Sequence, residues 1–165
     1  MPRRSPTSVY EIRSTFRAPL PFVFAWCTDY TARDPRLEKE KFRRRIVSRS
    51  RSRVVYEDLY DTPDGWMWSH WTVTLHPPHR WHADAFGSHR TWSLDYVLRE
   101  RPGGRTELTL RGRRRATVVG GKNPPKATLE RDLRGSWRHF GHALERDYRA
   151  GAARRRGRSR LRRRR

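Results

Sequence analysis

The segment from residue 125 to residue 149, PKATLERDLRGSWRHFGHALERDYR, decides the fold class. Its apolar residues recur at the three- and four-residue spacing of an amphipathic helix and fall within about 100° of arc around the helix axis. They are Leu129, Leu133, Trp137, Phe140, Leu144 and Tyr148. A single apolar stripe of this width predicts a long C-terminal helix with one face packed on a sheet.

The sequence before this helix has the two-residue period of β-strands. Residues 8–17 alternate apolar and polar side chains, which predicts a half-buried first strand. Pro19 and Pro21 then favour a short helix over residues 22–28. Turn signals separate about six further strands, and Gly120-Gly121 precedes the C-terminal helix.

These elements predict an α+β protein with short helices after the first strand. Its antiparallel sheet has about six or seven strands, and one helix cannot cover the inner face of so wide a flat sheet. We therefore expect the sheet to curve around the C-terminal helix. Curvature of this kind leaves space between helix and sheet, which is a place for a ligand.

Composition and charge predict one folded domain with charged ends. A chain of 165 residues is long enough for a single domain with its own core. We expect residues 1–7 to be a flexible N-terminus, residues 8–150 to form the domain, and residues 151–165 to be a disordered Arg-rich tail. From Arg149 to Arg165 there are ten arginines and no acid, within a net charge of +22. Such a tail predicts non-specific attraction to nucleic acid.

The cellular setting is predicted from three absences in the sequence. The single cysteine, Cys27, cannot form an internal disulfide, and its apolar neighbours predict an inert, buried thiol. There is no segment of roughly 20 apolar residues, as a membrane span requires, and no apolar core of a signal peptide near the N-terminus. A soluble cytoplasmic protein is the expectation.

The hairpin turns predict which residues share the inner face of the sheet. A turn at Ser50-Arg51 places Phe42 opposite Leu59, and the turn around Pro63 places Leu59 opposite Met67. In this register Arg44, Glu57 and Ser69 form a polar row that points at the helix. An acid beside a base in an aromatic cavity could orient the polar end of a ligand or act on it. The alternative is a structural ion pair at the cavity rim or the sheet edge.

The same register places a second set of polar and aromatic residues on the outer face. The predicted outer rows are Arg43, Asp58 and Trp68 in one and Arg45, Tyr56 and His70 in the other. Solvent-side ion pairs and stacking of arginine on aromatic rings explain such rows. The alternative is a nucleic-acid platform, because Arg and exposed aromatic rings together bind single strands.

Large aromatic residues are the remaining candidates for ligand contact. We expect the interior to contain Trp71, Trp81, Trp92, Tyr96, Trp137 and Phe140. Ordinary core packing accounts for each of them, yet together they suit a flat apolar or aromatic guest. Lys126, at the start of the helix, could meet an anionic group at the cavity mouth, or its side chain could extend to solvent.

Several short motifs resemble those of a known superfamily. They are the strand Tyr10-Glu11-Ile12-Arg13-Ser14-Thr15-Phe16, Ala18-Pro19, Val23-Phe24-Ala25-Trp26, Asp29-Tyr30, and Leu144-Glu145-Arg146-Asp147-Tyr148. Over residues 8–150 the chain resembles the START/Bet v 1-like (SRPBCC, helix-grip) superfamily, in particular its polyketide cyclase/dehydrase and lipid-transport-like branch. The resemblance implies a helix-grip domain. It does not select one function, because members include lipid and hormone binders, cyclases and a ribosome-association inhibitor.

Three functions remain open from the sequence. The first is binding of a hydrophobic or aromatic small molecule, lipid-like or polyketide-like, between the sheet and the C-terminal helix. The alternatives are an RNA- or ribosome-associated basic protein and a cyclase or dehydratase acting on a polyketide-like substrate. We expect no cofactor and no metal, because His76, His79 and His82 flank a diproline turn without a zinc-binding pattern. The oligomeric state stays open.

Overall fold

The computed structural model describes residues 7–38, 41–63, 65–117 and 123–162, with side chains as far as Ala152. Seven strands are followed by one long helix, and two short helical segments lie between the first two strands. In chain order the elements are β1 (Thr7–Phe16), α1 (Leu20–Cys27), the 3-10 helix η1 (Asp34–Leu37), β2 (Phe42–Arg49), β3 (Arg53–Thr62), β4 (Gly65–His76), β5 (Arg80–Gly87), β6 (Arg90–Arg101), β7 (Arg105–Ala116) and α2 (Lys126–Arg162).

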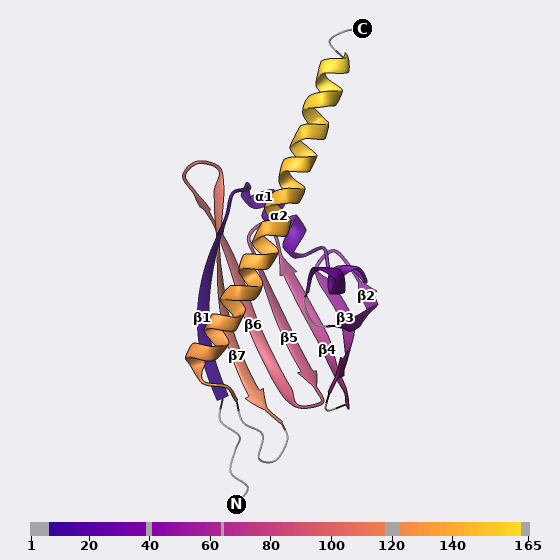
Figure 1. The fold of residues 1–165 in the computed structure, drawn as a ribbon, viewed down its shortest axis with the longest axis vertical. Helices are drawn as coiled ribbons and strands as arrows, with labels where there is room; N and C mark the ends of the chain where they lie inside the picture. The colour runs from indigo at the N-terminus through magenta and orange to yellow at the C-terminus, as the bar shows by residue number, and fades with distance from the viewer. Residues whose placement is uncertain (1–6, 39–40, 64, 118–122, 163–165) are drawn as a thin grey trace, which may run out of the picture.

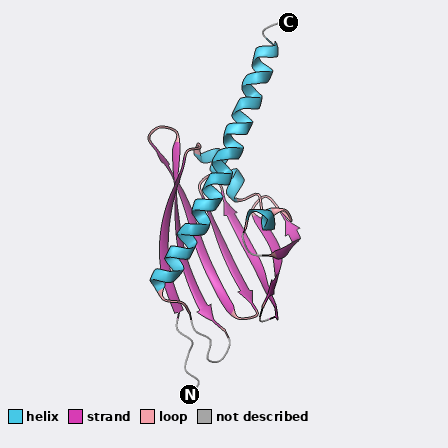
Figure 2. Ribbon diagram, viewed as in Figure 1, coloured by secondary structure: helices cyan, strands magenta, loops and turns pink. Residues whose placement is uncertain are grey.

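The strands form one antiparallel sheet in the order β1-β7-β6-β5-β4-β3-β2, with β1 and β2 at its edges. α2 runs diagonally across one face of the sheet and continues beyond its end (Figure 1). α1 lies where α2 leaves the end of the sheet, and η1 lies beside β2 at the other edge (Figure 2). This arrangement confirms the predicted α+β helix-grip architecture.

The core lies between α2 and the β1 side of the sheet. Inner residues of β1, β6 and β7 are buried against α2, among them Ile12, Leu98 and Leu110. From the predicted stripe of α2, Leu129 and Leu144 are buried. Leu133, Trp137 and Tyr148 pack on the core with part of their surface exposed. The stripe prediction is therefore confirmed, with its tightest contacts at Leu129 and Leu144.

Three carboxylates of α2 hold it over β1 and α1. Glu130 accepts a hydrogen bond of 3.2 Å from the backbone N–H of Glu11, and Glu145 accepts one of 2.8 Å from the backbone N–H of Arg17. Asp147 accepts a 3.0 Å bond from the indole N–H of Trp26. Because these bonds satisfy backbone and indole donors at the sheet edge, they fix α2 in position as well as in rotation.

The described part of α2 is longer than the sequence predicted. We expected the helix to end near Arg149 and the chain to be disordered from residue 151, but the helix continues to Arg162. Gly151 is a residue type that often ends helices, but alanine and arginine are strong helix formers and no proline follows residue 125, which favours continuation past Arg149. Within the described residues no helix is both long and apolar enough to span a membrane.

The predicted register of β3 is wrong by one residue on both sides. Phe42 pairs with Tyr60 rather than with Leu59, and Tyr60, not Leu59, pairs with Met67. A one-residue slip moves every side chain of a strand to the other face. The inner and outer faces of β3 are therefore exchanged relative to the prediction, while those of β2 and β4 are as predicted.

A β-bulge explains the error between β2 and β3. The pairing shifts between Ile46 and Ser48, so Val47 is an extra residue in β2. The turn is also displaced, because the backbone N–H of Ser50 bonds to the carbonyl of Arg53 at 2.8 Å and leaves Arg51-Ser52 at the tip. The displaced turn shifts the pairing by two residues, which keeps each side chain of β3 on its predicted face. The bulge shifts the pairing by one residue, which moves these side chains to the other face.

Candidate ligand-binding site

A buried ion-pair cluster lies on the inner face of β2 and β3. The guanidinium of Arg44 donates two hydrogen bonds of 2.8 Å to the two carboxylate oxygens of Asp58, and a third of 2.6 Å to Asp34. The side chains of Arg44 and Asp58 are 6% and 1% exposed. Burial lowers the pKa of Arg44, but the hydrogen bonds and negative charge of its partners outweigh burial and raise it, so the group is a permanent cation.

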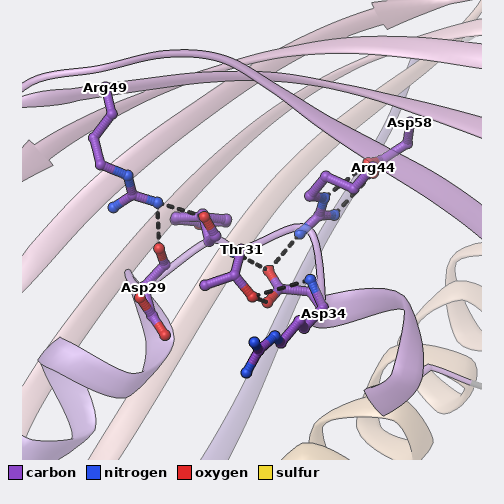
Figure 3. A network of polar contacts seen from close by, with 8 residues as sticks. Asp29, Thr31, Asp34, Arg44, Arg49 and Asp58 are labelled. Atoms are coloured by element: carbon purple, nitrogen blue, oxygen red, sulfur yellow. Dashed lines mark hydrogen bonds and ion pairs between the residues drawn. The ribbon is translucent and has the colours of Figure 1, made fainter.

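The loop between α1 and β2 is tied to this cluster (Figure 3). Asp34 accepts bonds from the backbone N–H and the hydroxyl of Thr31, at 3.0 and 2.8 Å. Arg49 donates to the carbonyls of Asp29 and Tyr30. These contacts hold Tyr30 in the left-handed backbone region, at a φ of 40°, which is unfavourable for a residue with a side chain.

Four aromatic rings extend from this loop across the inner face of the sheet. Tyr30 stacks on Tyr56 at 5.4 Å between ring centroids, Tyr56 on Trp71 at 5.8 Å, and Trp71 on Trp92 at 5.5 Å. We call these four residues the aromatic row. Arg44 lies over Tyr56, with its guanidinium carbon 4.0 Å from the ring centroid. Tyr56 is buried, whereas Tyr30, Trp71 and Trp92 keep part of their surface exposed.

A hollow of about 160 Å³ opens beside the aromatic row. Its lining includes Trp71 and Trp92 of the row, together with Tyr60, Met67, Trp68, Ser69, Ser88, His89 and Arg90. The hydroxyl of Ser69 accepts a 2.9 Å bond from the indole N–H of Trp71, which fixes the orientation of that ring. The site thus combines exposed aromatic surface with polar groups of fixed position.

The predicted polar row is correct for two of its three members. Arg44 and Ser69 face inward as predicted, and both lie opposite Asp58 in the sheet. Glu57 faces outward, where it pairs with Arg45 at 2.6 Å and His70 at 3.4 Å. Asp58 was predicted to face outward, as was Tyr56, and both are inside because β3 is displaced by one residue.

The other predicted aromatic residues lie closer to α2 and form core. Trp81 is 2% exposed and stacks on Tyr96 with 4.6 Å between ring centroids. Tyr96 and Phe140 both contact Trp137 of α2, at 6.0 and 5.6 Å. A side-chain contact between Trp81 and Tyr30 joins this group to the aromatic row, so Trp81, Tyr96, Trp137 and Phe140 form the boundary of the site on the α2 side. Trp71 and Trp92 belong to the row itself.

Lys126 is not part of the site. Its ammonium group extends to solvent and lies 3.8 Å from Glu130, one turn further along α2. Tyr30, Tyr56, Asp34 and Asp58 are in the site and were not among the predicted residues. The Asp29-Tyr30 dipeptide was visible in the sequence as a motif of the fold, but only the register of β3 could have identified Tyr56 and Asp58.

Comparisons with known proteins identify the fold. No protein-family model matches the chain, and no curated protein matches its sequence. Among solved structures it is similar to Ara h 8.0201, with 13% identity and a TM-score of 0.66, covering 88% of this chain and 99% of that one. It is also similar to the Zhui aromatase/cyclase from Streptomyces sp. R1128, with 14% identity and a TM-score of 0.66 over 87% of this chain and 94% of that one.

A START superfamily protein from Mycobacterium smegmatis is another structural neighbour, with 12% identity and a TM-score of 0.61 over 86% of this chain and 97% of that one. At these identities the similarity concerns the fold alone. The chain has the START/Bet v 1-like helix-grip fold, as its resemblance to that superfamily implied.

Proposed function

We propose that the protein binds a hydrophobic or aromatic small molecule on the inner face of its sheet, against the aromatic row. One observation carries the proposal: two of the stacked rings, Trp71 and Trp92, are only partly buried and line an open hollow. Structural neighbours described as an aromatase/cyclase and a START superfamily protein agree with a ligand of this class.

The size of the hollow limits how such a ligand is held. Its volume of about 160 Å³ is below the roughly 300 to 1,000 Å³ of enclosed small-molecule sites. A guest of two or more rings therefore has one end in the hollow and the rest on the exposed edges of Trp71 and Trp92. Flat apolar molecules suit this surface, because stacked rings gain both burial and ring contact.

The neutral fluorescent probe N-phenyl-1-naphthylamine tests this proposal. Trp71→Ala removes a central ring of the row, and we expect it to weaken probe binding at least about tenfold. Trp66→Ala is the matched control, because Trp66 lies on the opposite face of the same strand and is 59% exposed. Equal binding by both variants, or no binding by the unmodified protein, would overturn the proposal.

Binding of single-stranded nucleic acid is a second candidate function, supported by a patch on the outer face. We call Trp66, Trp68 and Phe86 the outer patch; each is about half exposed, and Trp68 meets Phe86 edge-on at 5.7 Å. Arg43 and Arg45 of β2 are exposed on the same face. Exposed rings beside arginines can stack on bases and contact phosphates.

A single-stranded RNA oligomer titrated at increasing salt tests this second function. We expect Trp68→Ala to weaken binding more than Trp71→Ala does, and a chain ending at Arg149 to show a smaller salt dependence. If no RNA is retained at moderate salt, or if only the shortened chain loses binding, the outer patch is not a nucleic-acid site.

The geometry gives less support to a cyclase or dehydratase reaction. Asp58 is the buried acid nearest to the aromatic row, and both of its oxygens already accept hydrogen bonds from Arg44. A carboxylate held in this way serves to position Arg44 rather than to abstract a proton. Ligand binding is therefore the function that the site supports best.

A further inference from the structure

We propose that the ligand carries an anionic group, a carboxylate, sulfonate or phosphate, and that Arg90 and Arg114 bind it at one end of the aromatic row. This inference rests on the proposed ligand-binding function and names the chemical class of the ligand. The two arginines, the arginine pair below, lie near the ring of Trp92, whereas Arg44 lies at the opposite end of the row.

Strand pairing places the arginine pair at the row. Arg114 of β7 pairs directly with Trp92 of β6, so its side chain is on the inner face beside that ring. The guanidinium carbon of Arg90 lies 5.5 Å from the centroid of the Trp92 ring. Arg90 also lines the hollow that contains Trp71 and Trp92. An apolar guest on the row therefore ends next to two guanidinium groups.

The arginine pair has no acid to balance it among the described residues. Neither residue forms an ion pair with a described carboxylate, and the Nε of Arg114 is buried without a hydrogen-bond partner. From Leu108 to Leu129 the sequence contains no Asp or Glu. Burial, together with the charge of Arg90, lowers the pKa of Arg114. Two unbalanced cations of this kind favour a bound anion.

Neighbouring groups add to the attraction for an anion. The side-chain amide of Asn123, just before α2, donates to the carbonyl of Arg114 at 3.4 Å, so α2 begins near this end of the row. The first turn of a helix carries partial positive charge. Burial raises the pKa of Tyr10 to about 12, and the nearby charge of Arg114 opposes that rise, so its hydroxyl is a neutral donor at neutral pH.

At the opposite end of the row, in contrast, the arginine is paired with carboxylates. Arg44 is covered by two carboxylates, Asp58 and Asp34, and has no free charge to offer. The end of the row at β2 therefore has one guanidinium beside two carboxylates, a formal charge of −1, whereas the end at β6 and β7 is positive. This polarity predicts one orientation for an amphiphilic ligand, with its anionic group toward the arginine pair.

Two probes with the same aromatic body separate the anion site from the aromatic row. The probe 8-anilino-1-naphthalenesulfonate is anionic, and N-phenyl-1-naphthylamine is its neutral counterpart. We expect Arg90→Gln and Arg114→Gln each to weaken binding of the anionic probe at least about tenfold, with the neutral probe changed less than about twofold. Arg113→Gln is the matched control, because it removes the same charge from the outer face of the same strand.

The outcomes distinguish the two proposals. If the neutral probe does not bind, the ligand-binding function itself fails. If it binds, but the control weakens the anionic probe as much as Arg114→Gln does, the effect is one of net charge and the anion site is refuted. Circular dichroism checks that each variant is folded, and Arg90→Gln keeps the test decisive if Arg114→Gln unfolds, because Arg90 is only partly buried.

Discussion

At the scale of single residues, two adjacent acids of β3 have opposite environments. Asp58 is buried against Arg44, and the side chain of Glu57 is 39% exposed beside Arg45. We expect Asp58→Asn to lower the free energy of unfolding by about 3 kcal/mol, because it leaves Arg44 buried with only Asp34 as partner. Glu57→Gln should lower the free energy of unfolding by less than about 1 kcal/mol, since exposed ion pairs contribute little to stability.

Urea unfolding of both variants measures this difference. The two substitutions remove the same charge from neighbouring positions, so the comparison isolates burial. Similar losses in both variants would contradict the observed face of β3, and a larger loss in Glu57→Gln would restore the face that the sequence predicted.

Glu57 and Asp58 also show which part of the site the sequence could not predict. Arg44 and Ser69 were placed correctly from strand periodicity, because β2 and β4 keep their faces whatever the register of β3. Glu57 and Asp58 differ by one position, and only the bulge at Val47 and the turn at Thr62 decide between them. The bulge has no distinctive residue type. The Pro63-Asp64-Gly65 sequence indicates a turn but does not fix which residues pair across it, so the sequence could indicate a buried acid but not which one.

A histidine on the outer face gives a prediction for pH dependence. His82 lies between Asp84 and Asp95, with N···O distances of 3.0 and 2.7 Å. Burial lowers the pKa of His82, but the two carboxylates outweigh it, so the pKa is raised above 6.5. Stabilisation by the protonated ring is therefore complete below that value and is lost as pH rises through the raised pKa.

The comparison of the unmodified protein with His82→Gln at about pH 5.5 and pH 8.5 measures this contribution. We expect the difference in unfolding free energy to be larger at the lower pH. Its size should be about 0.5 kcal/mol or less, because solvent screens a partly exposed cluster. A larger difference at pH 8.5 would show that the neutral ring is the stabilising form.

At the scale of elements, two glycines of α2 differ in what surrounds them. A Cβ on Gly135 would meet nothing within 4 Å, whereas a Cβ on Gly141 would lie 3.2 Å from the ring of Phe16 in β1. We expect Gly135→Ala to stabilise the protein by about 0.5 to 1 kcal/mol through helix propensity. Gly141→Ala should lower the melting temperature, because Phe16 is buried and has little room to move.

Thermal unfolding of the two variants tests how closely α2 approaches β1. Both changes add one methyl group to the same helix. The gain in helix propensity is therefore matched, and the two variants differ only in what the new methyl group contacts. If Gly141→Ala is stabilised as much as Gly135→Ala, the helix is not in tight contact with Phe16.

The sequence predicted α2 as an element better than it predicted how α2 is held. The apolar stripe defined its buried face, because helical period is a property of local sequence. The bonds that Glu130 and Glu145 accept from backbone N–H groups in β1 and just after it join residues more than 100 positions apart and leave no local pattern. The helix continues past Arg149 although Gly151 is a residue type that often ends helices.

At the scale of the whole molecule, the position of α2 explains where the proposed site lies. The helix packs chiefly on β1, so the inner face of β3 to β6 keeps exposed aromatic surface. The loop between α1 and β2 borders this surface and contributes Tyr30 to it. The inner face of the sheet is therefore covered by α2 near β1, and by the loop between α1 and β2 at the opposite edge.

This asymmetry predicts where a bound ligand changes local stability. The amide hydrogen bonds given for the loop from Thr28 to Asp34 are local ones, within the loop or to α1, so its amide hydrogens should exchange by local opening in the free protein. A guest on Trp71 lies beside Tyr56, the ring on which Tyr30 stacks, and should therefore stabilise the loop against Tyr56. We expect saturating N-phenyl-1-naphthylamine to slow amide exchange several-fold in this loop, with little change in β1 and β7.

Hydrogen exchange followed by mass spectrometry, with and without the probe, measures the effect. Trp71→Ala serves as control, because a protein that no longer binds the probe should show no added protection. Protection confined to the outer patch around Trp68 and Phe86 would place the probe on the wrong face of the sheet. Protection of the loop in the unmodified protein, but not in Trp71→Ala, would link the loop to ligand binding. The left-handed backbone of Tyr30 would then have a function, which is to hold its ring at the binding surface.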